Sequence, residues 1–493
     1  MAERYWIETL GCPKNQVDSD KLVGTLTAEG YEEAVAPDQA DLVVVNTCAF
    51  IEAARQESVD TVLALADTRR EGARLVVTGC MAERYGNELA EALPEVDLVA
   101  PFGVSLTGPP RTGTEAGTDT ETGIETADIE PPRATPVLLG RKPVVLSTGP
   151  AVPSFDLLNL PRPPSAAPWS YIKVAEGCDR NCGFCAIPSF RGKQRSRSTG
   201  SILAEVDQLG GPDGSLREVV LVAQDLSSFA LDRSTGRTEP RLDGPAVGGN
   251  RPIVDLVHAV ARRVGWVRLL YLYPSTLDDA LVDAILGAGV PYFDLSLQHV
   301  SRPLLRRMRR WGDGERFLDR IASIRAAEPT AAFRSSFIVG YPGETEADHD
   351  LLLEWLTAAQ LDWVGFFPFS NEVGTHAAGL PDQIDPDLVA ERLRECTELQ
   401  DGITARRRDD LVGATVEVLV DAPGEGRTYR EAPEIDGIVS VPGHLPVGSF
   451  AEVVVTGADG PDLVAESAPA AGTPARHPRD RPLAASASAA TAR

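Results

Sequence analysis

Three cysteines stand close together in the segment EGCDRNCGFCAIPSFRG, where Cys178, Cys182 and Cys185 have the spacing CxxxCxxC. Three thiolates so near in sequence converge only if the backbone loops around a common point, which is how a cubane iron–sulfur cluster is held. Gly177 and Gly183 give the loop the backbone freedom it needs. Since a structural cluster would take four cysteines, three leave one iron open for a substrate. The alternative is a zinc loop, but zinc sites pair one CxxC with a second or with histidines, and no fourth ligand stands nearby in the sequence.

A second set of cysteines is spread along the chain. Cys12, Cys48 and Cys80 each directly follow a predicted strand, in TLGC, VNTC and VTGC. The carboxyl ends of neighbouring parallel strands lie side by side, and ligands bind in the crevice beyond them. We therefore expect these three thiols to meet and to hold an auxiliary cluster, again with one iron open. The alternative is three buried cysteines acting as small hydrophobes, which is the interpretation we favour for the seventh cysteine, Cys396 in VAERLRECTELQ.

The elements that must position the second set alternate between strand-like and helix-like segments over residues 1–104. The strand candidates are YWIETL, DLVVVN and RLVVTG, and helical patterns cover residues 19–29 and 53–66. Val- and Leu-rich strands alternating with helices predict a doubly wound α/β domain.

A longer alternation covers residues 166–400. Its strand candidates are SYIKVAEG, EVVLVAQD, VRLLYLY, YFDLSLQ, AFRSSFIVG and DWVGFFPF. Helical patterns lie at 201–208, 253–263, 277–286, 303–308, 315–327 and 346–358. Six β–α units predict a partial (β/α)6 barrel, closed or partly open. The first cysteine triplet follows the first of these strands, at the end where barrel active sites form.

The remaining segments differ in composition. Residues 105–165 are rich in Thr, Gly, Pro and Glu and predict a flexible linker. Residues 234–250 look like a surface insertion after the second barrel strand. In residues 405–467 the strands ATVEVLV, IDGIVSV and SFAEVVV predict a small antiparallel β-barrel, and residues 468–493 predict a disordered tail.

Composition limits the class of protein. The chain has 493 residues, a formal net charge of −25 and seven cysteines. It contains no run of about 18 apolar residues and its first residues lack the layout of a signal peptide, so we expect a cytoplasmic protein. Seven cysteines in such a chain favour metal ligation or catalysis over disulfides. The acidic charge disfavours nucleic acid as the main partner unless a basic patch overrides it.

The first triplet resembles the motif of the radical S-adenosylmethionine (SAM) superfamily. In that family the methionine amino and carboxylate groups chelate the open iron, and the reduced cluster cleaves SAM to a 5′-deoxyadenosyl radical that abstracts hydrogen from an unactivated carbon. The resemblance implies cofactor contacts at Phe184 (on adenine), at Gln224 and Asp225 (toward the methionine amine), and at Gly340 and Gly343 of FIVGYPGETEAD (toward the adenosyl group). Loop polarity could equally explain Gln224 and Asp225, and a tight strand-to-helix turn could explain the glycines.

The sequence leaves two interpretations open for each of two further features. His299, in LQH at the end of the fourth barrel strand, is either a substrate contact or a structural histidine. The basic stretch RGKQRSRS is either a solvated loop or a grip on an acidic substrate loop or a cofactor carboxylate; it contains Arg191, Lys193, Arg195 and Arg197.

The chain as a whole, apart from linker, insertion and tail, resembles the methylthiotransferases, which have a three-cysteine domain, a radical SAM core and a C-terminal TRAM β-barrel. The segments LGCPKNQVDSD, VNTCAFIEAARQESVDT, CAIPSFRGKQRSRS, LLYLYP and YREAPEIDG resemble the RimO type. This resemblance implies methylthiolation of the β-carbon of an aspartate in small-subunit ribosomal protein S-twelve, with sulfur delivered at the auxiliary cluster. It also implies two 4Fe-4S clusters, SAM, a low-potential electron donor of flavodoxin or ferredoxin type, and a sulfur source. Radical abstraction needs no general base, so no acid or base residue is assigned.

Charge favours the same branch of the family. Residues 411–467 contain ten acidic residues and two arginines, a balance of −8. An RNA-binding barrel should be basic, whereas an acidic one suits a basic protein. The alternatives are a tRNA adenosine methylthiotransferase and a non-catalytic iron–sulfur regulator or scaffold.

Overall fold

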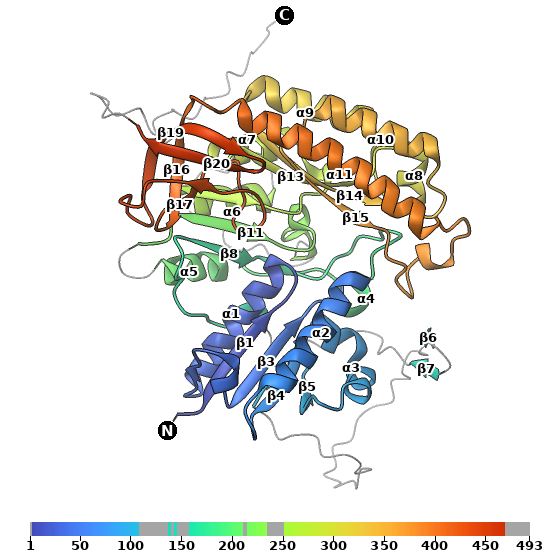
Figure 1. Cartoon of the computed structure of the whole chain (residues 1–493), viewed down its shortest axis with the longest axis vertical. Coiled ribbons are helices and arrows are strands. Elements are labelled where there is room, and N and C mark those ends of the chain that lie inside the picture. Colours follow the sequence, from blue (N-terminus) through green and yellow to red (C-terminus); the bar gives the residue numbers. More distant parts are fainter. Residues whose placement is uncertain are drawn as a thin grey trace, which may run out of the picture.

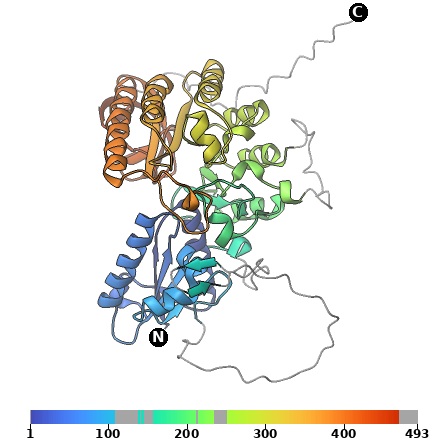
Figure 2. The same ribbon diagram turned by 90° about the vertical axis from the view of Figure 1, so that its right-hand side faces the viewer.

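The computed structural model of the protein describes residues 2–107, 137–139, 142–144, 157–210, 214–233 and 251–468. The predicted insertion (234–250), most of the predicted linker and the predicted disordered tail after residue 468 lie outside these ranges. Figures 1 and 2 both show the N-terminal domain beneath a larger core, and Figure 1 shows the C-terminal barrel on one side of that core. Within the linker, β6 (Val137–Leu139) and β7 (Lys142–Val144) form a short antiparallel pair. None of the described helices is long and apolar enough to cross a membrane.

The N-terminal domain is a five-stranded parallel sheet with helices on both faces, as the sequence predicts. Its strands have the order β2-β1-β3-β4-β5. Val43 and Val45 pack with residues of α2 and α3, whereas Leu42 and Val44 pack with residues of α1. Burial on both faces accounts for the unbroken Val-rich runs. The elements are β1 (Arg4–Thr9), α1 (Pro13–Ala28), β2 (Glu32–Glu33), β3 (Leu42–Thr47), α2 (Glu52–Thr68), β4 (Arg74–Gly79), α3 (Cys80–Ala92) and β5 (Leu98–Val99).

Helix α1 begins at Pro13, earlier than the predicted start at residue 19. The sequence of its first two turns is polar and shows no apolar periodicity, so no helical signal appears there. Four of these polar residues, Lys14, Asn15, Asp18 and Ser19, are nevertheless buried. The last three pack through hydrogen bonds and ion pairs, which a hydrophobic pattern does not reveal.

The core is a partial barrel of six parallel strands in two three-stranded sheets, β12-β11-β8 and β13-β14-β15. A parallel bridge between Leu272 and Leu295 joins the sheets. Among the described residues β8 and β15 do not pair, so the barrel is open on that side. The strands are β8 (Trp169–Lys173), β11 (Glu218–Val222), β12 (Trp266–Leu269), β13 (Tyr292–Gln298), β14 (Ala332–Val339) and β15 (Trp363–Pro368).

Helices alternate with these strands. They are α5 (Thr199–Leu209), α6 (Pro252–Ala261), α7 (Asp279–Gly287), α8 (Arg302–Arg307), α9 (Gly314–Ala327), α10 (Glu346–Ala359) and α11 (Pro386–Asp409). Between β8 and α5 the chain also forms β9 (Ala175–Glu176), α4 (Ile187–Arg191) and β10 (Arg195–Ser196). Cys396 of α11 is fully buried in the core cluster, which confirms its predicted structural role.

The C-terminal domain is a closed five-stranded barrel with the order β16-β17-β18-β20-β19. Its neighbouring strands pair antiparallel, except β18 and β20, which are parallel. The barrel begins after α11, so residues 405–409 of the predicted barrel domain belong to that helix instead. Its strands are β16 (Thr415–Ala422), β17 (Glu425–Arg427), β18 (Val439–Ser440), β19 (Phe450–Asp459) and β20 (Asp462–Ser467).

Some acidic side chains of the barrel are buried and form ion pairs with the core. Glu431 is fully buried and pairs with Arg408 of α11 at 2.5 Å. Asp436 pairs with Arg334 of β14 at 3.4 Å and accepts a hydrogen bond from the Tyr292 hydroxyl at 2.6 Å. These carboxylates attach the barrel to the core. The charge count from sequence therefore overstates the charge that the barrel surface presents.

The end of the predicted linker is folded, which corrects its boundary. Residues 157–159 form a short 3-10 helix in which Leu157 and Leu158 are buried. Lys21 of α1 donates a hydrogen bond to the Leu158 carbonyl at 2.6 Å. Arg162 is buried and pairs with Asp20 of α1 at 2.7 Å. This segment therefore packs against α1. Its Pro- and Ser-rich composition gives no sign of this packing, because the contacts that anchor it are polar.

Candidate iron–sulfur and cofactor site

The cysteines of the N-terminal domain, here called the auxiliary triad (Cys12, Cys48 and Cys80), lie at the carboxyl ends of three neighbouring strands. Cys12 caps α1 after β1, Cys48 directly follows β3, and Cys80 is the first residue of α3 after β4. Gly11, at φ +97°, lets the first two approach: a Cβ added there would stand 2.8 Å from Cys48 Cβ and 3.0 Å from Cys48 Sγ. Cys80 Sγ lies 3.7 Å from Asn15 Oδ1, one helical turn beyond Cys12. The sheet thus brings the three cysteines to one edge, and their role as ligands of a cluster stays a prediction.

The thiols of this triad influence one another. Burial, and then the nearby Cys80 and Cys12 thiols, raise the pKa of Cys48 to about 12. Burial also acts to raise the pKa of Cys12, but Lys14, backbone hydrogen bonds and Arg191 outweigh it and leave that pKa below the ordinary value. Three thiolates packed together need a cationic centre, so the donor set fits a thiolate-bound metal cluster.

The spacing of the cysteines bears on the kind of metal. Among the described residues, no group of three or more His, Cys, Asp or Glu side chains is placed to hold a single metal ion. A cubane binds each thiolate at a different iron, so its ligands stand farther apart than those of one ion. The absence of such a group does not distinguish a cluster from the zinc-loop alternative, and the cluster stays a prediction.

The second group, here called the radical triad (Cys178, Cys182 and Cys185), lies on the loop between β9 and α4. Gly177, at φ +81°, starts this loop, and a Cβ there would come within 2.6 Å of the Gly192 carbonyl. Burial raises the pKa of Cys178 to about 11 and that of Cys185 to about 12, with contributions from the neighbouring thiols. Burial and the neighbouring thiols thus disfavour the thiolate forms of Cys178 and Cys185, as they do for Cys48.

Two arginines beside the radical triad are not apparent from the sequence. Arg310 Nη1 lies 3.4 Å from Cys182 Sγ, and Arg180 donates its backbone N–H to Cys178 Sγ at 3.4 Å. Their guanidinium groups stack on the ring of Tyr273, at 3.9 Å for Arg180 and 4.1 Å for Arg310. The LLYLYP segment contains this tyrosine, but nothing in its spacing indicates two cationic partners.

The polar pair predicted at the end of β11 faces this site. Gln224 Nε2 donates to Glu176 at 2.5 Å, and Asp225 Oδ2 accepts from Arg180 Nε at 2.6 Å. Gln224 Oε1 and Asp225 Oδ1 are buried and have no hydrogen-bond partner among the described residues. Two unpaired buried acceptors suit a donor group, and their contact with the methionine amine stays a prediction.

The glycines of FIVGYPGETEAD have packing roles. Gly340 and Gly343 both have φ +82°, and a Cβ would overlap Val389 at the first and come within 2.6 Å of Arg307 Cζ at the second. Glu344 closes the turn by accepting the Gly340 N–H at 2.7 Å. A tight turn accounts for both glycines, and their contact with the adenosyl group stays a prediction. Phe184 packs partly buried against the core cluster, and its contact with adenine also stays a prediction.

The structure shows the surroundings of the two features for which the sequence leaves two interpretations open. His299 is fully buried, its Nδ1 accepts the Ser301 N–H at 3.0 Å, and burial lowers its pKa to about 4. Its Nε2 has no hydrogen-bond partner among the described residues, so both interpretations of this histidine stay open. The basic stretch is not a solvated loop at Arg191 and Arg197, which are both buried. Arg197 pairs with Glu205, because the buried carboxylate requires a cation.

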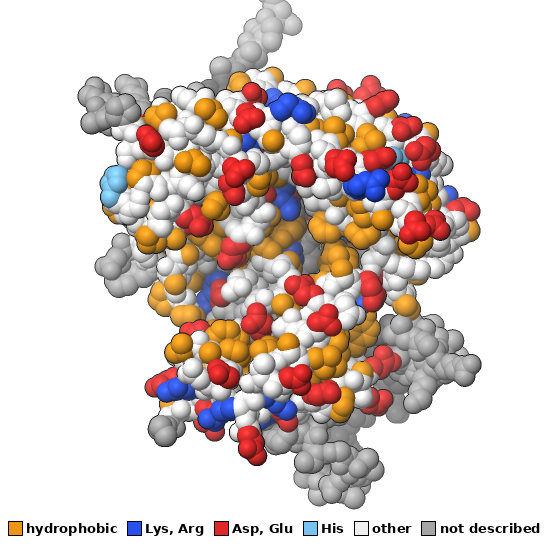
Figure 3. All heavy atoms as spheres, viewed as in Figure 1, with side chains coloured by type: hydrophobic (Ala, Val, Ile, Leu, Met, Phe, Trp, Pro, Cys, Tyr) orange, Lys and Arg blue, Asp and Glu red, His pale blue; other side chains and the backbone are white. Residues whose placement is uncertain are grey.

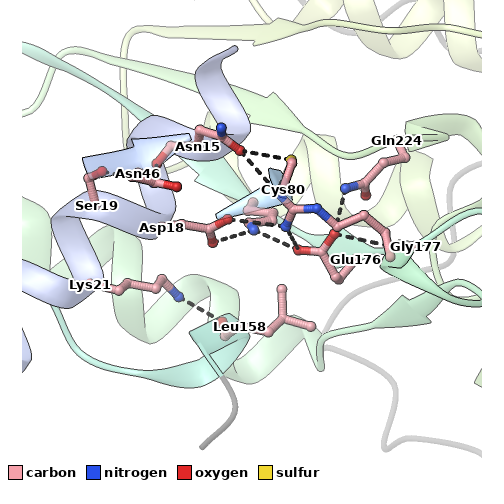
Figure 4. A network of polar contacts seen from close by, with 12 residues as sticks. Asn15, Asp18, Ser19, Lys21, Asn46, Cys80, Leu158, Glu176, Gly177 and Gln224 are labelled. Atoms are coloured by element: carbon pink, nitrogen blue, oxygen red, sulfur yellow. Dashed lines mark hydrogen bonds and ion pairs between the residues drawn. The ribbon is translucent and has the colours of Figure 1, made fainter. Parts of the chain in front are cut away.

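Arg191 connects Cys80 of the auxiliary triad with Glu176, before the radical triad, through a buried polar network. Figure 4 shows Asn15, Asp18, Cys80 and Glu176 of this network. Arg191 Nη2 lies 2.9 Å from Cys80 Sγ and 2.9 Å from Asn15 Oδ1. Its Nη1 lies 3.2 Å from Asp18 of the N-terminal domain and 3.2 Å from Glu176, two residues before Cys178. Lys173 of β8 pairs with both carboxylates. The sequence marks Arg191 as basic but does not reveal that it connects two domains.

A second contact joins the domains at the other side of the auxiliary triad. Glu372, in the loop after β15, pairs with Arg55 of α2 at 2.8 Å and with Arg84 of α3 at 2.7 Å. The backbone N–H of Glu52 donates to the Ser370 hydroxyl at 3.1 Å. The N-terminal domain is thereby held to the core on two sides of the site.

Comparisons with known proteins agree with this architecture. Residues 4–101 match the family described as uncharacterized protein family UPF0004, residues 172–356 the radical SAM superfamily, and residues 412–467 the TRAM domain. Among curated relatives, proteins from Cutibacterium acnes and Streptomyces coelicolor are each 39% identical, over 93% and 94% of this chain and 97% and 96% of their own. One from Salinispora tropica is 40% identical over 94% of this chain and 95% of its own. All three are named ribosomal protein uS12 methylthiotransferase RimO.

These three domains in one chain define an enzyme of the radical SAM methylthiotransferase class. Because the relatives cover nearly the whole length, the chain belongs to the RimO family of methylthiotransferases. The fold expected from the sequence is confirmed in all three domains.

Proposed function

We propose that this protein replaces one hydrogen on the β-carbon of an aspartate in ribosomal protein uS12 (S-twelve) with a methylthio group. The auxiliary triad would hold one 4Fe-4S cluster and the radical triad another. When bound, the radical-triad cluster supplies reductive cleavage of SAM and the auxiliary cluster carries the sulfur to be inserted. The reaction also requires a low-potential electron donor of flavodoxin or ferredoxin type and a sulfur source, and with a ribosomal protein as substrate it takes place in the cytoplasm.

The observation that carries the proposal is a buried arginine that contacts the auxiliary triad and also the segment just before the radical triad. Cys80 of the auxiliary triad and Glu176, which precedes the radical triad, contact the same Arg191 side chain at 2.9 and 3.2 Å. Sulfur insertion needs the carbon radical and the sulfur donor to form close together, because a free radical reacts with whatever is nearest. A rigid, buried link between the two sites is what such a reaction requires.

The chain's own residues would bind and orient SAM. Gln224 Oε1 and Asp225 Oδ1 are buried acceptors without partners among the described residues, which fits the amino group of a methionine. Arg180 donates to Asp225 Oδ2 at 2.6 Å and so holds the carboxylate in one orientation. Asp225 Oδ1 would then accept a hydrogen bond from one defined direction. Phe184, Gly340 and Gly343 would contact the adenosyl part.

The charge of the surface favours a protein over RNA as substrate. The exposed acidic residues of the barrel are Glu425, Glu434, Glu452, Asp459 and Glu466. Asp and Glu side chains are also spread over much of the face drawn in Figure 3, which is hollowed between the N-terminal domain and the core. An acidic surface attracts a basic protein and repels a phosphate backbone.

The test is a reaction of the anaerobically reconstituted enzyme with SAM, a strong reductant, sulfide and uS12 labelled with deuterium at the β-carbons of its aspartates. We expect a methylthio group on one aspartate and deuterium in the released 5′-deoxyadenosine. Transfer of label identifies the carbon attacked, and a uS12 variant with that aspartate changed to asparagine serves as the control. A methylthio group on tRNA adenosine in a parallel reaction, with none on uS12, would overturn the proposal. So would release of no 5′-deoxyadenosine, as expected of a regulator or scaffold.

A further inference from the structure

Arg191 is a buried cation in an unusual position. It is the last residue of α4, six residues after Cys185, and therefore belongs to the loop region that carries the radical triad. Only 7% of it is exposed. Its contacts lie mostly in the other domain: the guanidinium stands 4.2 Å from the ring of Phe102, beyond β5, and reaches residues of α1 and α3. A buried arginine of this kind needs a reason, because removing it from water is costly.

The contacts fix the guanidinium in one orientation. Nη1 lies between the carboxylates of Asp18 and Glu176, at 3.2 Å from each. Lys173 holds the same two carboxylates from the other side, with 2.6 Å to Glu176. Phe102 covers the face of the group. Because the planar guanidinium of Arg191 is held at Nη1 and on one face, Nη2 cannot rotate to another position.

The other nitrogen is directed at a cysteine of the auxiliary triad. Nη2 donates to Asn15 Oδ1 and approaches Cys80 Sγ, both at 2.9 Å. Asn15 in turn donates to the Leu10 and Thr47 carbonyls, at 2.9 and 3.1 Å, which fixes the loops before Cys12 and Cys48. Arg191 therefore touches one triad thiol directly and the framework of the other two.

We propose that Arg191 is a positioning residue of the auxiliary cluster, holding the Cys80 thiolate by a charge-assisted hydrogen bond from the radical SAM core. This inference rests on the proposed auxiliary cluster. Hydrogen bonds to cluster sulfurs raise the reduction potential, because they stabilise the more negative, reduced state. The core domain would thereby adjust the affinity and potential of a cluster bound by a different domain.

The test isolates the auxiliary cluster in the full-length chain by changing Cys178, Cys182 and Cys185 to Ala. In this background we compare Arg191→Gln and Arg191→Lys with the parent, using redox titration followed by EPR, and the rate at which a chelator removes iron. We expect a lower reduction potential and a several-fold faster loss of iron in Arg191→Gln. Arg191→Lys keeps the charge without the fork and should shift both quantities less.

Lys193→Gln is the matched control, because it removes the same charge from the exposed side of the same segment. It should leave both quantities unchanged. In a second background, with Cys12, Cys48 and Cys80 changed to Ala, Arg191→Gln should leave the potential of the radical-triad cluster unchanged, which also shows that the variant folds.

Three outcomes overturn the inference. An auxiliary cluster whose potential and iron retention are the same with and without Arg191 would refute the role of this residue alone. Equal shifts of the reduction potential and of the rate of iron loss in Lys193→Gln would show that any loss of positive charge in this segment has the same effect. A parent that binds no iron at the auxiliary triad would refute the proposed function itself, and the inference with it.

Discussion

The two oxygens of the Asp225 carboxylate differ in what they contact. One accepts hydrogen bonds from Arg180 at 2.6 Å and from the Ser228 hydroxyl at 2.7 Å. The other is buried and unpaired among the described residues. At the scale of single residues, an unsatisfied acceptor beside the radical triad is suited to a donor group of a ligand.

Asp225→Ala should therefore weaken binding of SAM. A hydrogen bond to a charged group contributes about 1.5–3 kcal/mol, so we expect affinity to fall about 10- to 100-fold. Equilibrium binding of SAM to the reconstituted protein measures this. Asp207→Asn, which changes a carboxylate exposed on α5, should have no effect; an unchanged affinity in Asp225→Ala would rule out this oxygen as a ligand.

At the scale of elements, the barrel is attached to the core by buried carboxylates that titrate. Burial, opposed in part by Arg334 and the Tyr292 hydroxyl, raises the pKa of Asp436 to about 6. In the unfolded chain an aspartate has a pKa of about 3.9. The native state therefore keeps this proton at pH values where the unfolded state has released it. The stability contributed by Asp436 is highest below about pH 4 and falls as the pH rises to about 6.

Asp436→Asn should remove this dependence. We expect the unfolding free energy of the wild type, relative to the variant, to decrease by about 3 kcal/mol between pH 4 and pH 7. Denaturant unfolding followed by tryptophan fluorescence at several pH values tests this. Asp459→Asn, on the barrel surface, serves as the control; a difference that does not vary with pH would contradict the assignment.

The elements themselves are largely predictable from the sequence. β3 and β4 are Val-rich because both faces are buried, and β13 and β14 have nearly the predicted limits for the same reason. The positions of the six cysteines of the two triads, at strand ends and in one loop, follow from those strands. The contacts that connect the two domains do not follow from the sequence pattern. Asp18 and Arg191 are polar residues that pair across the two domains, and polar packing across domains has no periodic signal in the sequence.

At the scale of the whole molecule, the N-terminal domain must remain on the core for the two triads to act together. Glu372 is held by Arg55 and Arg84 and is almost completely buried. Glu372→Gln removes a charge from between two arginines, and breaking a buried pair costs about 3–5 kcal/mol. We expect the domains to separate more often while each keeps its cluster.

The expected result is uncoupling. Glu372→Gln should release 5′-deoxyadenosine at nearly the wild-type rate, with the yield of methylthiolated product per 5′-deoxyadenosine several-fold lower. Quantifying both by mass spectrometry gives this ratio. Glu354→Gln, exposed on α10, should keep the wild-type ratio, and an unchanged ratio in Glu372→Gln would mean that this contact does not maintain the site.

The central claim is that one chain holds two separate clusters, one on each cysteine triad. Counting iron and sulfide after anaerobic reconstitution tests it most directly, in the wild type and in a variant with Cys12, Cys48 and Cys80 all changed to Ala. Two cubanes predict about eight irons and eight sulfides per chain in the wild type, falling to about four of each in the variant. The same count in both proteins would contradict the claim, because the auxiliary triad would then hold no cluster.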